Sequence, residues 1–550
     1  IRMSTQMPSG FRDQLCKEVL DIPTDRVRVL VGDVGGGFGM KTGLYAEDAV
    51  VAFAAQRLGR PVRWAAERME DFLAALHGRD TDSKVELALD ANGKVLGLRV
   101  RTLANLGGYT RNAGVAIQLL IGPWVSTSIY DITNIDFQFT AVLTNTAPTG
   151  PYRGAGRPEA IYIIERLMDA AARKLGLDPA ELRRRNMIQP EQMPYKNAMG
   201  QSYDSGSFEK IMDQALAASD WNGFAARAAQ SAKAGKLRGR GIATFLEWTG
   251  GNVFEERVTV AVKANREIEI YATTQAMGQG IATSYAQLAV DVFGVSLDNI
   301  KIVMGDSDRG SGFGSAGSRS LFTAGSAVKV AADKTVDKAR DLAADALEVA
   351  PVDLEYLAGA FQVAGTDRRI GLFELAAKQP EGRIFIDSTS SVSGPTWPNG
   401  CHIAEVEIDP DTGEVAIPLY VSSNDAGRVV NPLIVEGQVV GGALQGIGQA
   451  LCEAVIYDPA TGQPLTASFM DYTMPRADML PTATTLLDQS IPCRTNPLGV
   501  KGVGELGTIG ATPALVNAVA DALARHGRGA EADTLQMPLT PPRIWAMLQG

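Results

Sequence analysis

Hydrophobic and polar residues alternate along several short segments, which is the pattern of half-buried β-strands. Residues 85–89 and 94–101 alternate in this way on either side of the turn at 90–93 and predict a β-hairpin. Two further pairs repeat the scheme around polar turns, namely 258–262 with 267–271 and 404–408 with 414–417. These pairs predict antiparallel sheet in both halves of the chain.

Other segments carry apolar residues at helical spacing. Between residues 164 and 175 the apolar positions are Ile164, Leu167, Met168, Ala171 and Leu175. Asp178-Pro179 combines a capping residue with a first-turn proline and predicts a helix through Leu182. Helices and strands together place the chain in the α+β class.

A second capping signal stands near the C-terminal end. Thr512-Pro513 predicts the start of a helix that runs to His526 and ends at Gly527. The most apolar stretch, residues 437–451, is too short for a membrane span of about 20 residues and carries three glutamines. We therefore expect no transmembrane segment.

The polar stretch 189–205, with its prolines and glycines, is the best candidate domain boundary. It predicts a first domain over residues 1–190 and a larger second domain over 200–550. A chain of 550 residues is also too long for one simple core.

Composition and charge narrow the function. The net charge of −10 argues against a nucleic-acid partner, which needs a basic face. The four cysteines lie far apart and there are only three histidines, so the sequence contains no recognisable disulfide framework, zinc site or iron–sulfur ligand set. A reducing, cytoplasmic location is the expectation. If this protein binds a metal ion, we expect the ligands of the metal to come from a cofactor rather than from cysteine or histidine side chains.

Four loops combine glycine with amide, hydroxyl or charged side chains, at residues 32–39, 275–280, 310–320 and 502–507. Glycine lets backbone N–H groups approach an anion closely. Several such loops suit a large anionic cofactor with phosphates and heterocyclic nitrogens. The first loop also approaches a nucleotide-binding P-loop, since Lys41-Thr42 follow it, but Met40 stands where that motif has glycine.

Five segments, read in order, resemble the molybdopterin-binding portion of the xanthine dehydrogenase and carbon monoxide dehydrogenase family, the molybdenum hydroxylases. They are Ser4-Thr5-Gln6, GGGFG at 35–39, PYRGAGRPE at 151–159, MGQG at 277–280 and KGVGE at 501–505. Residues 317–320 and 437–446 support the match, which therefore covers nearly the whole chain.

The resemblance implies two mixed α/β domains with the cofactor between them. In this family a pterin dithiolene holds the molybdenum and no protein side chain ligates it. The family's large subunit also has a further N-terminal domain before the segment that matches Ser4-Thr5-Gln6, so we expect that part to be supplied by a separate chain or to be missing here. The expected cofactor is molybdenum with molybdopterin cytosine dinucleotide.

The resemblance also assigns roles to individual residues. Glu505 matches the catalytic glutamate, the base for a water-derived hydroxide that attacks an electrophilic carbon. Gln6 matches a glutamine that hydrogen-bonds an oxygen at the metal. The cofactor-binding positions implied are Gly36, Gly37, Phe38, Arg153, Gly278, Gln279, Gly280, Gly317, Ser318, Arg319, Ser320, Gln445 and Gly504.

Substrate class is constrained by what the loops lack. Carbon monoxide oxidisers of the family carry a copper-holding cysteine where this chain has Gly154-Ala155-Gly156. The polar anchors of purine oxidisers fall on Thr42 and Ile121, which cannot replace them. An N-heteroaromatic substrate is preferred, because the PYRGAGRPE form of the loop resembles enzymes for such compounds; an aldehyde is the alternative.

Electrons must leave the reduced metal, and this chain has no iron–sulfur ligands. The resemblance therefore predicts a partner subunit with 2Fe–2S clusters and a second partner with FAD. A non-catalytic cofactor-binding protein is the rival interpretation, and Glu505 argues against it because a pure binder needs no base. A P-loop nucleotide hydrolase is a third, which would require ATP and magnesium.

Overall fold

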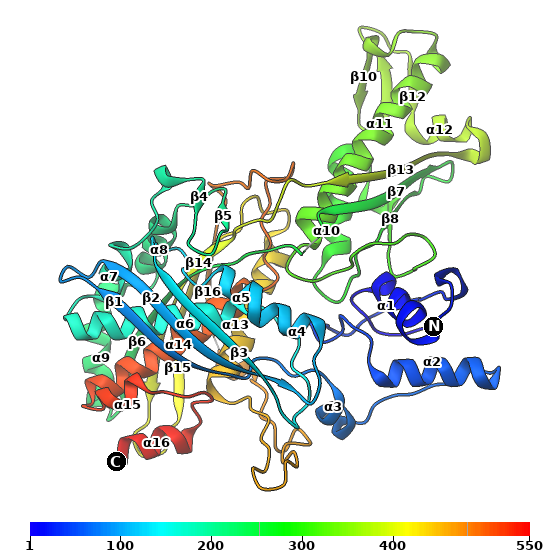
Figure 1. The fold of residues 1–550 in the computed structure, drawn as a ribbon. Coiled ribbons are helices and arrows are strands. Elements are labelled where there is room, and N and C mark those ends of the chain that lie inside the picture. Colours follow the sequence, from blue (N-terminus) through cyan, green and yellow to red (C-terminus); the bar gives the residue numbers. More distant parts are fainter. Residues whose placement is uncertain (252, 481, 550) are drawn as a thin grey trace.

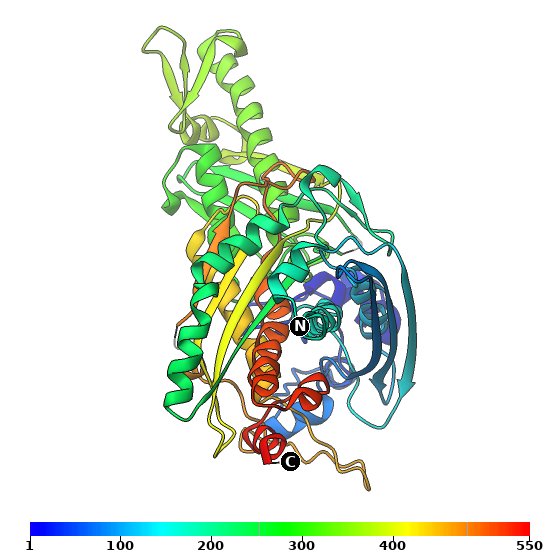
Figure 2. The same cartoon turned by 90° about the vertical axis from the view of Figure 1, so that its left-hand side faces the viewer.

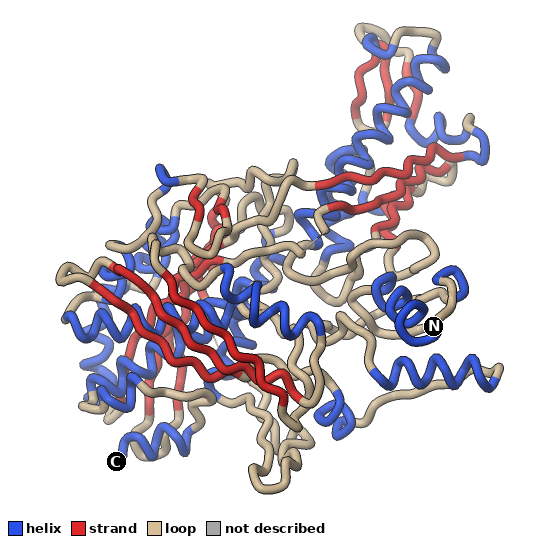
Figure 3. Tube along the Cα trace, viewed as in Figure 1, coloured by secondary structure: helices blue, strands red, loops and turns tan. Residues whose placement is uncertain are grey.

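The structure is a computed structural model that describes residues 1–251, 253–480 and 482–549. Helices and strands are mixed along the chain, as the α+β prediction required (Figure 3). Two regions stand out in Figure 1: a broad layered body, and a lobe built from residues near the middle of the chain that projects at the top.

The first sheet lies on one face of the body. It consists of β1 (Thr81–Leu89), β2 (Val95–Gly107) and β3 (Ile135–Leu143). β1 and β2 are antiparallel and confirm the predicted hairpin, whereas β3 runs parallel to β2. Side chains of β1 alternate between half-buried and exposed, as the sequence pattern indicated.

The second sheet has the order β16-β15-β14-β6. Its strands are β6 (Leu237–Leu246), β14 (Asn399–Ile408), β15 (Val415–Asp425) and β16 (Thr484–Asp488). β14 and β15 confirm another predicted hairpin and extend beyond the predicted residues. α6 (Arg157–Leu175) and α14 (Leu506–Arg525) lie between the two sheets, so Figure 2 shows a sheet, a helical layer and a second sheet, with further helices outside.

The projecting lobe is built on a third sheet, of order β13-β7-β8-β9, which α10 and α11 pack against (Figure 1). The predicted pair at 258–262 and 267–271 is confirmed as β7 and β8. The elements of this lobe are β7 (Glu255–Lys263), β8 (Ile268–Ala272), α10 (Ile281–Phe293), β9 (Ile300–Val303), α11 (Ser326–Leu347), β10 (Leu354–Leu357), β11 (Ala360–Val363), β12 (Arg369–Gly371), α12 (Leu372–Ala377) and β13 (Arg383–Ser391).

The remaining elements are mostly short. They are α1 (Pro8–Gln14), α2 (Ala46–Leu58), α3 (Arg68–Ala74), α4 (Asn112–Ala116), α5 (Gly122–Trp124), α7 (Pro179–Arg184), β4 (Tyr195–Lys196), β5 (Ser202–Tyr203), α8 (Phe208–Ala218), α9 (Phe224–Lys233), α13 (Pro432–Leu451), α15 (Gly529–Asp533) and α16 (Pro541–Gln549). Asp178 caps α7 by accepting hydrogen bonds from the N–H groups of Ala180 and Glu181, as predicted.

The predicted start of the helix at Thr512-Pro513 is wrong. α14 begins at Leu506, and Pro513 lies inside it. The Thr512 hydroxyl does not cap a helix, because it donates to the Gly446 carbonyl of α13 at 3.1 Å. The Thr-Pro pair resembles a helix N-cap in sequence, but in the structure Thr512 makes a contact between two helices.

α14 is the one described helix whose length and composition would allow it to cross a membrane, and 94% of its apolar window is buried inside the fold. It packs between α6, α13 and the second sheet. Its apolar character is that of a central core helix. The apolar stretch 437–451 lies in α13, which packs beside it.

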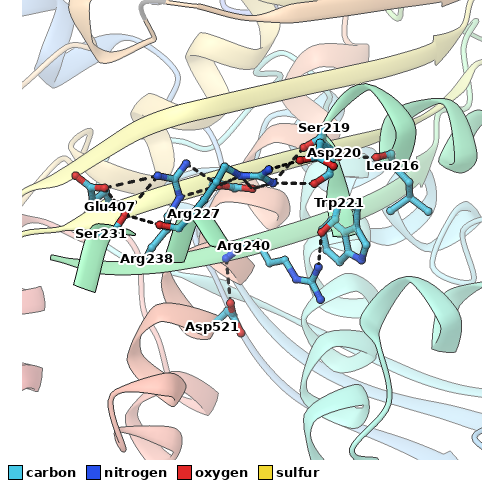
Figure 4. A network of polar contacts seen from close by, with 11 residues as sticks. Leu216, Ser219, Asp220, Trp221, Arg227, Ser231, Arg238, Arg240, Glu407 and Asp521 are labelled. Carbon is cyan, nitrogen blue, oxygen red and sulfur yellow. Dashed lines mark hydrogen bonds and ion pairs between the residues drawn. The ribbon is translucent and has the colours of Figure 1, made fainter. Parts of the chain in front are cut away.

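A polar network joins α9 to β6, an edge strand of the second sheet, and to β14 beside it (Figure 4). Glu405, 2% exposed, accepts hydrogen bonds from Arg227 of α9 at 2.6 Å and from Arg238 of β6 at 2.7 Å. Ser231 donates to Glu407 at 2.6 Å. A buried carboxylate between two guanidinium groups is compensated in this way.

The contact between α13 and α14 depends on glycine. A Cβ atom on Gly507 would lie 2.0 Å from the Val439 carbonyl oxygen, and one on Gly442 would lie 3.1 Å from the Gly507 Cα. Backbones approach this closely only without side chains. The close packing fixes the start of α14, and therefore the loop just before it.

Gly507→Ala is expected to lower the free energy of unfolding by about 1–3 kcal/mol, because the two helices must separate. Urea denaturation measures the change. Gly437→Ala is the matched control, since a Cβ there meets nothing within 4 Å and alanine is favoured over glycine in helices by up to ~1 kcal/mol. Equal destabilisation by both substitutions would contradict the packing argument.

Candidate active site

Glu505 stands at the N-terminus of α14, in the position of its N-cap. One carboxylate oxygen accepts a hydrogen bond from the Gly154 N–H at 2.8 Å. The other contacts the Arg157 guanidinium at 2.8 Å and the Ser318 hydroxyl at 2.9 Å. The side chain is 12% exposed, so it is held on three sides and still reaches solvent-accessible space.

The surroundings of Glu505 favour its ionised form. Burial alone raises its pKa, but Arg157, the Gly154 N–H, the Ser318 hydroxyl and Arg153 together lower the pKa below its ordinary value. A helix N-terminus also attracts negative charge. The residue is therefore a carboxylate at neutral pH, ready to accept a proton.

Arg153 joins three segments beside Glu505. Its guanidinium donates to the Gly504 carbonyl at 2.6 Å, to Gln445 Oε1 at 3.0 Å and to the carbonyl and side-chain oxygens of Gln438 at 3.0 and 3.1 Å. Its planar fork suits such a set of oxygens. Its guanidinium carbon also lies 5.6 Å from the centre of the Phe38 ring. The predicted positions Arg153, Gln445, Gly504 and Phe38 are thus brought together.

Gln6 is 1% exposed, and both ends of its amide are bonded. Its Nε2 donates to the Ser315 carbonyl at 2.8 Å, and its Oε1 accepts from the Gly39 N–H at 2.9 Å. A Cβ on Gly37 would lie 2.6 Å from that Oε1. Gly36 likewise lies against Phe38, since its Cβ would be 2.8 Å from the ring. The glycine loop therefore packs directly on Gln6 and Phe38.

The loop at 275–280 leads into α10, with Gly280 as the N-cap. Gln279 folds back on its own loop, because its amide donates to the Gln275 carbonyl at 3.0 Å and accepts from the Met277 N–H at 2.6 Å. Gln275 in turn contacts Ser315, whose hydroxyl donates to its carbonyl at 2.8 Å. Gly278 has a φ of +108° at the tip of the loop.

Residues 317–320 immediately precede a π-helical turn, Leu321–Gly325, which continues into α11. Ser318 faces Glu505, whereas the Ser320 hydroxyl donates to that of Ser315 at 2.9 Å. Arg319 is fully buried, pairs with Glu256 and lies 4.6 Å from the centre of the Phe313 ring. The predicted cofactor role of Arg319 would therefore rest on its backbone.

These contacts form one continuous site. The segment 315–320 bonds Gln6 and Gln275 at one end and Glu505 at the other. Glu505 and Gly504 then bond the loop at 153–157, and Arg153 continues to α13. Segments separated by up to about 500 residues in the sequence thus meet in one place.

Two important residues of the site were not assigned a role from the sequence. Arg157, 1% exposed, stands in the PYRGAGRPE segment, and its basic side chain there was the available signal. Glu247 follows the apolar strand β6, and nothing in its sequence context indicates that it lies beside Ser318. Only the folded chain brings it to the site.

The chemistry of the site suits an anionic ligand rather than a bare metal ion. α6, α10 and α14 begin at three of these loops, and the turn leading into α11 begins at a fourth. The first N–H groups of a helix lack intrahelical partners and attract anions. Within the described ranges there is no group of three or more His, Cys, Asp or Glu side chains placed to hold a metal.

If the resemblance noted in the sequence holds, Gly37→Ala is expected to reduce both turnover and the content of the molybdenum that the resemblance implies, because the new methyl group displaces a Gln6 amide that is bonded at both ends. Metal content per chain and kcat measure the effect. Gly32→Ala, in the same loop with nothing within 4 Å of the added Cβ, is the control and should behave as the wild type. Unchanged metal content and kcat in Gly37→Ala would refute this packing role.

Comparison with known proteins agrees with this chemistry. Two sequence models, both described as Molybdopterin cofactor-binding domain, match residues 1–187 and 214–481. The chain is 35% identical to the 6-hydroxypseudooxynicotine dehydrogenase complex subunit gamma of Paenarthrobacter nicotinovorans, over 98% of this chain and 68% of that protein. It is 33% identical to the nicotine 6-hydroxylase large subunit of the same organism, over 100% of this chain and 69% of that protein.

Among solved structures, quinoline 2-oxidoreductase from Pseudomonas putida 86 superimposes with a TM-score of 0.93 at 33% identity. The match covers 100% of this chain and 72% of that one. The present chain therefore spans roughly two thirds of the length of these relatives.

Proposed function

Because the chain belongs to the molybdenum hydroxylases, as a molybdopterin-binding large-subunit chain, we propose that it hydroxylates an electrophilic C–H carbon of an N-heteroaromatic compound with oxygen from water. The enzyme is an oxidoreductase, as its relatives are. The observation that carries the proposal is Glu505, an ionised base held by the loop at 153–157 and by the segment 315–320.

The chain's own residues supply the base and its orientation. Glu505 accepts the proton of the attacking water-derived hydroxyl group. The Gly154 N–H, Arg157 and Ser318 hold both of its oxygens in place while this happens. Gln6, fixed by Ser315 and Gly39, presents a buried amide beside the glycine loop. Preorganised groups of this kind need no rearrangement during the reaction.

The cofactor in this proposal is molybdopterin cytosine dinucleotide, and the helix N-termini that meet at the site support an anionic group of this kind. When bound, this group supplies the oxidising metal and activates the water. Arg153, Gln279 and Gln445 would hold the pterin, and residues 317–320 would hold the phosphates at the start of the turn that leads into α11. A Cβ on Gly278 would meet nothing within 4 Å, so the tip of this loop leaves room for a ligand, whereas glycine at 36, 37, 280 and 504 lets those loops pack closely on their neighbours.

The substrate class is supported by the relatives and by the loop at 154–156. The names of three relatives refer to 6-hydroxypseudooxynicotine, nicotine and quinoline, which are N-heteroaromatic compounds. Ala155 is small and half-buried with a φ of +44°, in a loop that contains no cysteine for copper. Thr42 donates its hydroxyl to the Gly39 carbonyl at 2.8 Å, so it is engaged within its own loop.

Two partner subunits complete the proposed enzyme, one with 2Fe–2S clusters and one with FAD, in the cytoplasm. Relatives are named as subunits of complexes. α2 has no buried residue, and Val50, Phe53 and Leu58 on it are more than half exposed. Exposed apolar helices of this kind are typical of protein–protein contacts.

The experiment is metal analysis and turnover of the purified complex. We expect about one molybdenum per chain, release of cytidine monophosphate on acid hydrolysis, and reduction of an artificial electron acceptor with pyridine or quinoline compounds. Turnover of aldehydes but not of pyridine or quinoline compounds would show that the substrate is an aldehyde and not an N-heteroaromatic compound. An active preparation without molybdenum, or one that needs ATP and magnesium, would overturn the function.

A further inference from the structure

Glu247 is a buried carboxyl group beside the catalytic base. It follows β6, is 0% exposed, and its Oε1 lies 2.7 Å from the Ser318 hydroxyl oxygen. Its Oε2 is buried and has no hydrogen-bond partner among the residues that the structure describes. The same Ser318 hydroxyl lies 2.9 Å from Glu505. One hydroxyl therefore stands between two carboxyl groups.

The number of protons decides how these three groups are bonded. A serine hydroxyl has one proton to donate and can accept through its lone pairs. Two ionised carboxylates can only accept hydrogen bonds, so Ser318 could donate to one of them only. The lone pairs of its hydroxyl oxygen would then lie against the lone pairs of the other carboxylate, without a proton between them. Both short contacts are hydrogen bonds only if one carboxyl group is protonated and its O–H group donates a hydrogen bond to Ser318.

The surrounding charges indicate which carboxyl group that is. Glu505 is paired with Arg157 at 2.8 Å and with the Gly154 N–H. Glu247 has no guanidinium or N–H partner of this kind for its side chain among the described residues, and its carboxyl group contacts that of Glu505 as well as the Ser318 hydroxyl. Burial raises the pKa of Glu247 to about 8, with Arg157 opposing the rise and Glu505 adding to it. The charged groups that face the pair are Arg157 and Arg153.

We propose that Glu247 is a positioning residue, a neutral carboxylic acid that donates a hydrogen bond to the Ser318 hydroxyl, which in turn donates a hydrogen bond to Glu505. The relay fixes the carboxylate of Glu505 in one orientation and stabilises its ionised form. This inference rests on the proposed function for the role of Glu505. No covalent bond is formed or broken, and the proton stays on Glu247 during turnover.

Ser318 is built for this contact. Its φ of +56° lies in the left-handed region, which is unusual for a residue with a side chain. Gly502 and Gly504 pack against it, because a Cβ on Gly502 would lie 2.6 Å from the Ser318 carbonyl oxygen and one on Gly504 would lie 3.3 Å from its hydroxyl oxygen. The strained backbone is held by the same loop that carries Glu505.

The relay has a pH dependence with a definite sign. Below a pH of about 8 Glu247 is neutral and the relay is intact. As pH rises through this value Glu247 ionises, Ser318 can serve only one carboxylate, and a second negative charge lies beside Glu505. We expect activity to fall on the basic side for this reason.

Infrared difference spectroscopy of the assembled complex tests the proposal without relying on turnover. We expect the C=O band of a buried protonated carboxyl group at neutral pH, present in the wild type and in Glu505→Gln, absent from Glu247→Gln, and lost from the wild type above a pH of about 8. If Glu247→Gln retains the band, or the wild type lacks it, the proposal is overturned. The band can be measured whether or not the protein has hydroxylase activity, so a failure of the proposed function would not affect this test.

Kinetics of two variants provide the second readout. Glu247→Gln keeps an N–H donor for Ser318, so kcat near neutral pH should be preserved. In the pH profile of kcat, the fall on the acidic side should remain and the fall on the basic side should disappear. Glu247→Leu removes the donor at similar volume and should lower kcat on the order of 10–100-fold with little change in KM, since the base loses its orientation. If Glu247 is instead ionised, Glu247→Gln removes a negative charge and shifts the acidic limb to lower pH, which would contradict the relay.

Discussion

Replacing Glu505 with glutamine is expected to lower kcat by at least ~10²–10⁴-fold, the usual contribution of a general base. The amide is nearly the same size, so the loop at 502–507 keeps its course, but it cannot accept the proton. Molybdenum content should stay at the wild-type level, because none of the predicted cofactor contacts uses the Glu505 charge. Steady-state kinetics and metal analysis of the same preparation measure both effects.

The substitution also leaves the buried Arg157 without its carboxylate, and we therefore expect some loss of stability. Glu414→Gln, an exposed change in the turn after β14, controls for the loss of a glutamate. Turnover within a few-fold of wild type in Glu505→Gln would show that another group is the base. Loss of molybdenum in parallel with activity would make Glu505 a structural residue instead.

The second large effect concerns stability. Glu165 and Arg183 form an ion pair at 2.8 Å with both side chains 0% exposed. Glu165 also accepts from the Thr244 N–H at 3.0 Å and from the Tyr130 hydroxyl. Glu165→Ala leaves the buried Arg183 guanidinium without its carboxylate partner and should lower the free energy of unfolding by about 3–5 kcal/mol. Urea denaturation of the purified chain measures it.

Glu181→Ala is the control for this prediction, because Glu181 pairs with Arg185 at the surface with 44% of its side chain exposed. Surface pairs of this kind contribute about 0–1 kcal/mol. A double replacement of Glu165 and Arg183 by methionine should recover part of the loss, since no charge is then left buried. Equal effects of the buried and surface changes would contradict this assignment.

The Glu165 network also bears on how the domains are joined. Tyr130, Glu165 and Arg183 precede the predicted boundary at 189–205, whereas Thr244 follows it. One hydrophobic core likewise includes Val100 and Ile164 together with Ile242 and Ile403. The division into residues 1–190 and 200–550 remains a prediction. A core that crosses it indicates that the two parts are closely packed.

The sequence predicted local structure well where a periodic pattern decides it. The hairpin of β1 and β2 and the cap of α7 follow from alternation and from Asp178. The start of α14 was missed because Thr512 bonds Gly446, a residue 66 positions away. A long-range contact of this kind leaves no local signal.

The same limit applies to the site. Glycine loops and the order of five segments identified Glu505, Gln6 and Arg153, whose contacts the structure now specifies. The individual cofactor roles remain predictions. Glu247 could not be found, because a glutamate after an apolar strand has many possible surroundings. Only its burial beside Ser318 reveals a chemical role.

The source of the product oxygen tests the central claim most directly. The purified complex would be run with an N-heteroaromatic substrate and an artificial electron acceptor in water labelled with heavy oxygen, and the product analysed by mass spectrometry. The account predicts that the new hydroxyl oxygen carries the label of the water. A product whose oxygen comes from dissolved dioxygen, with no label from water, would contradict it.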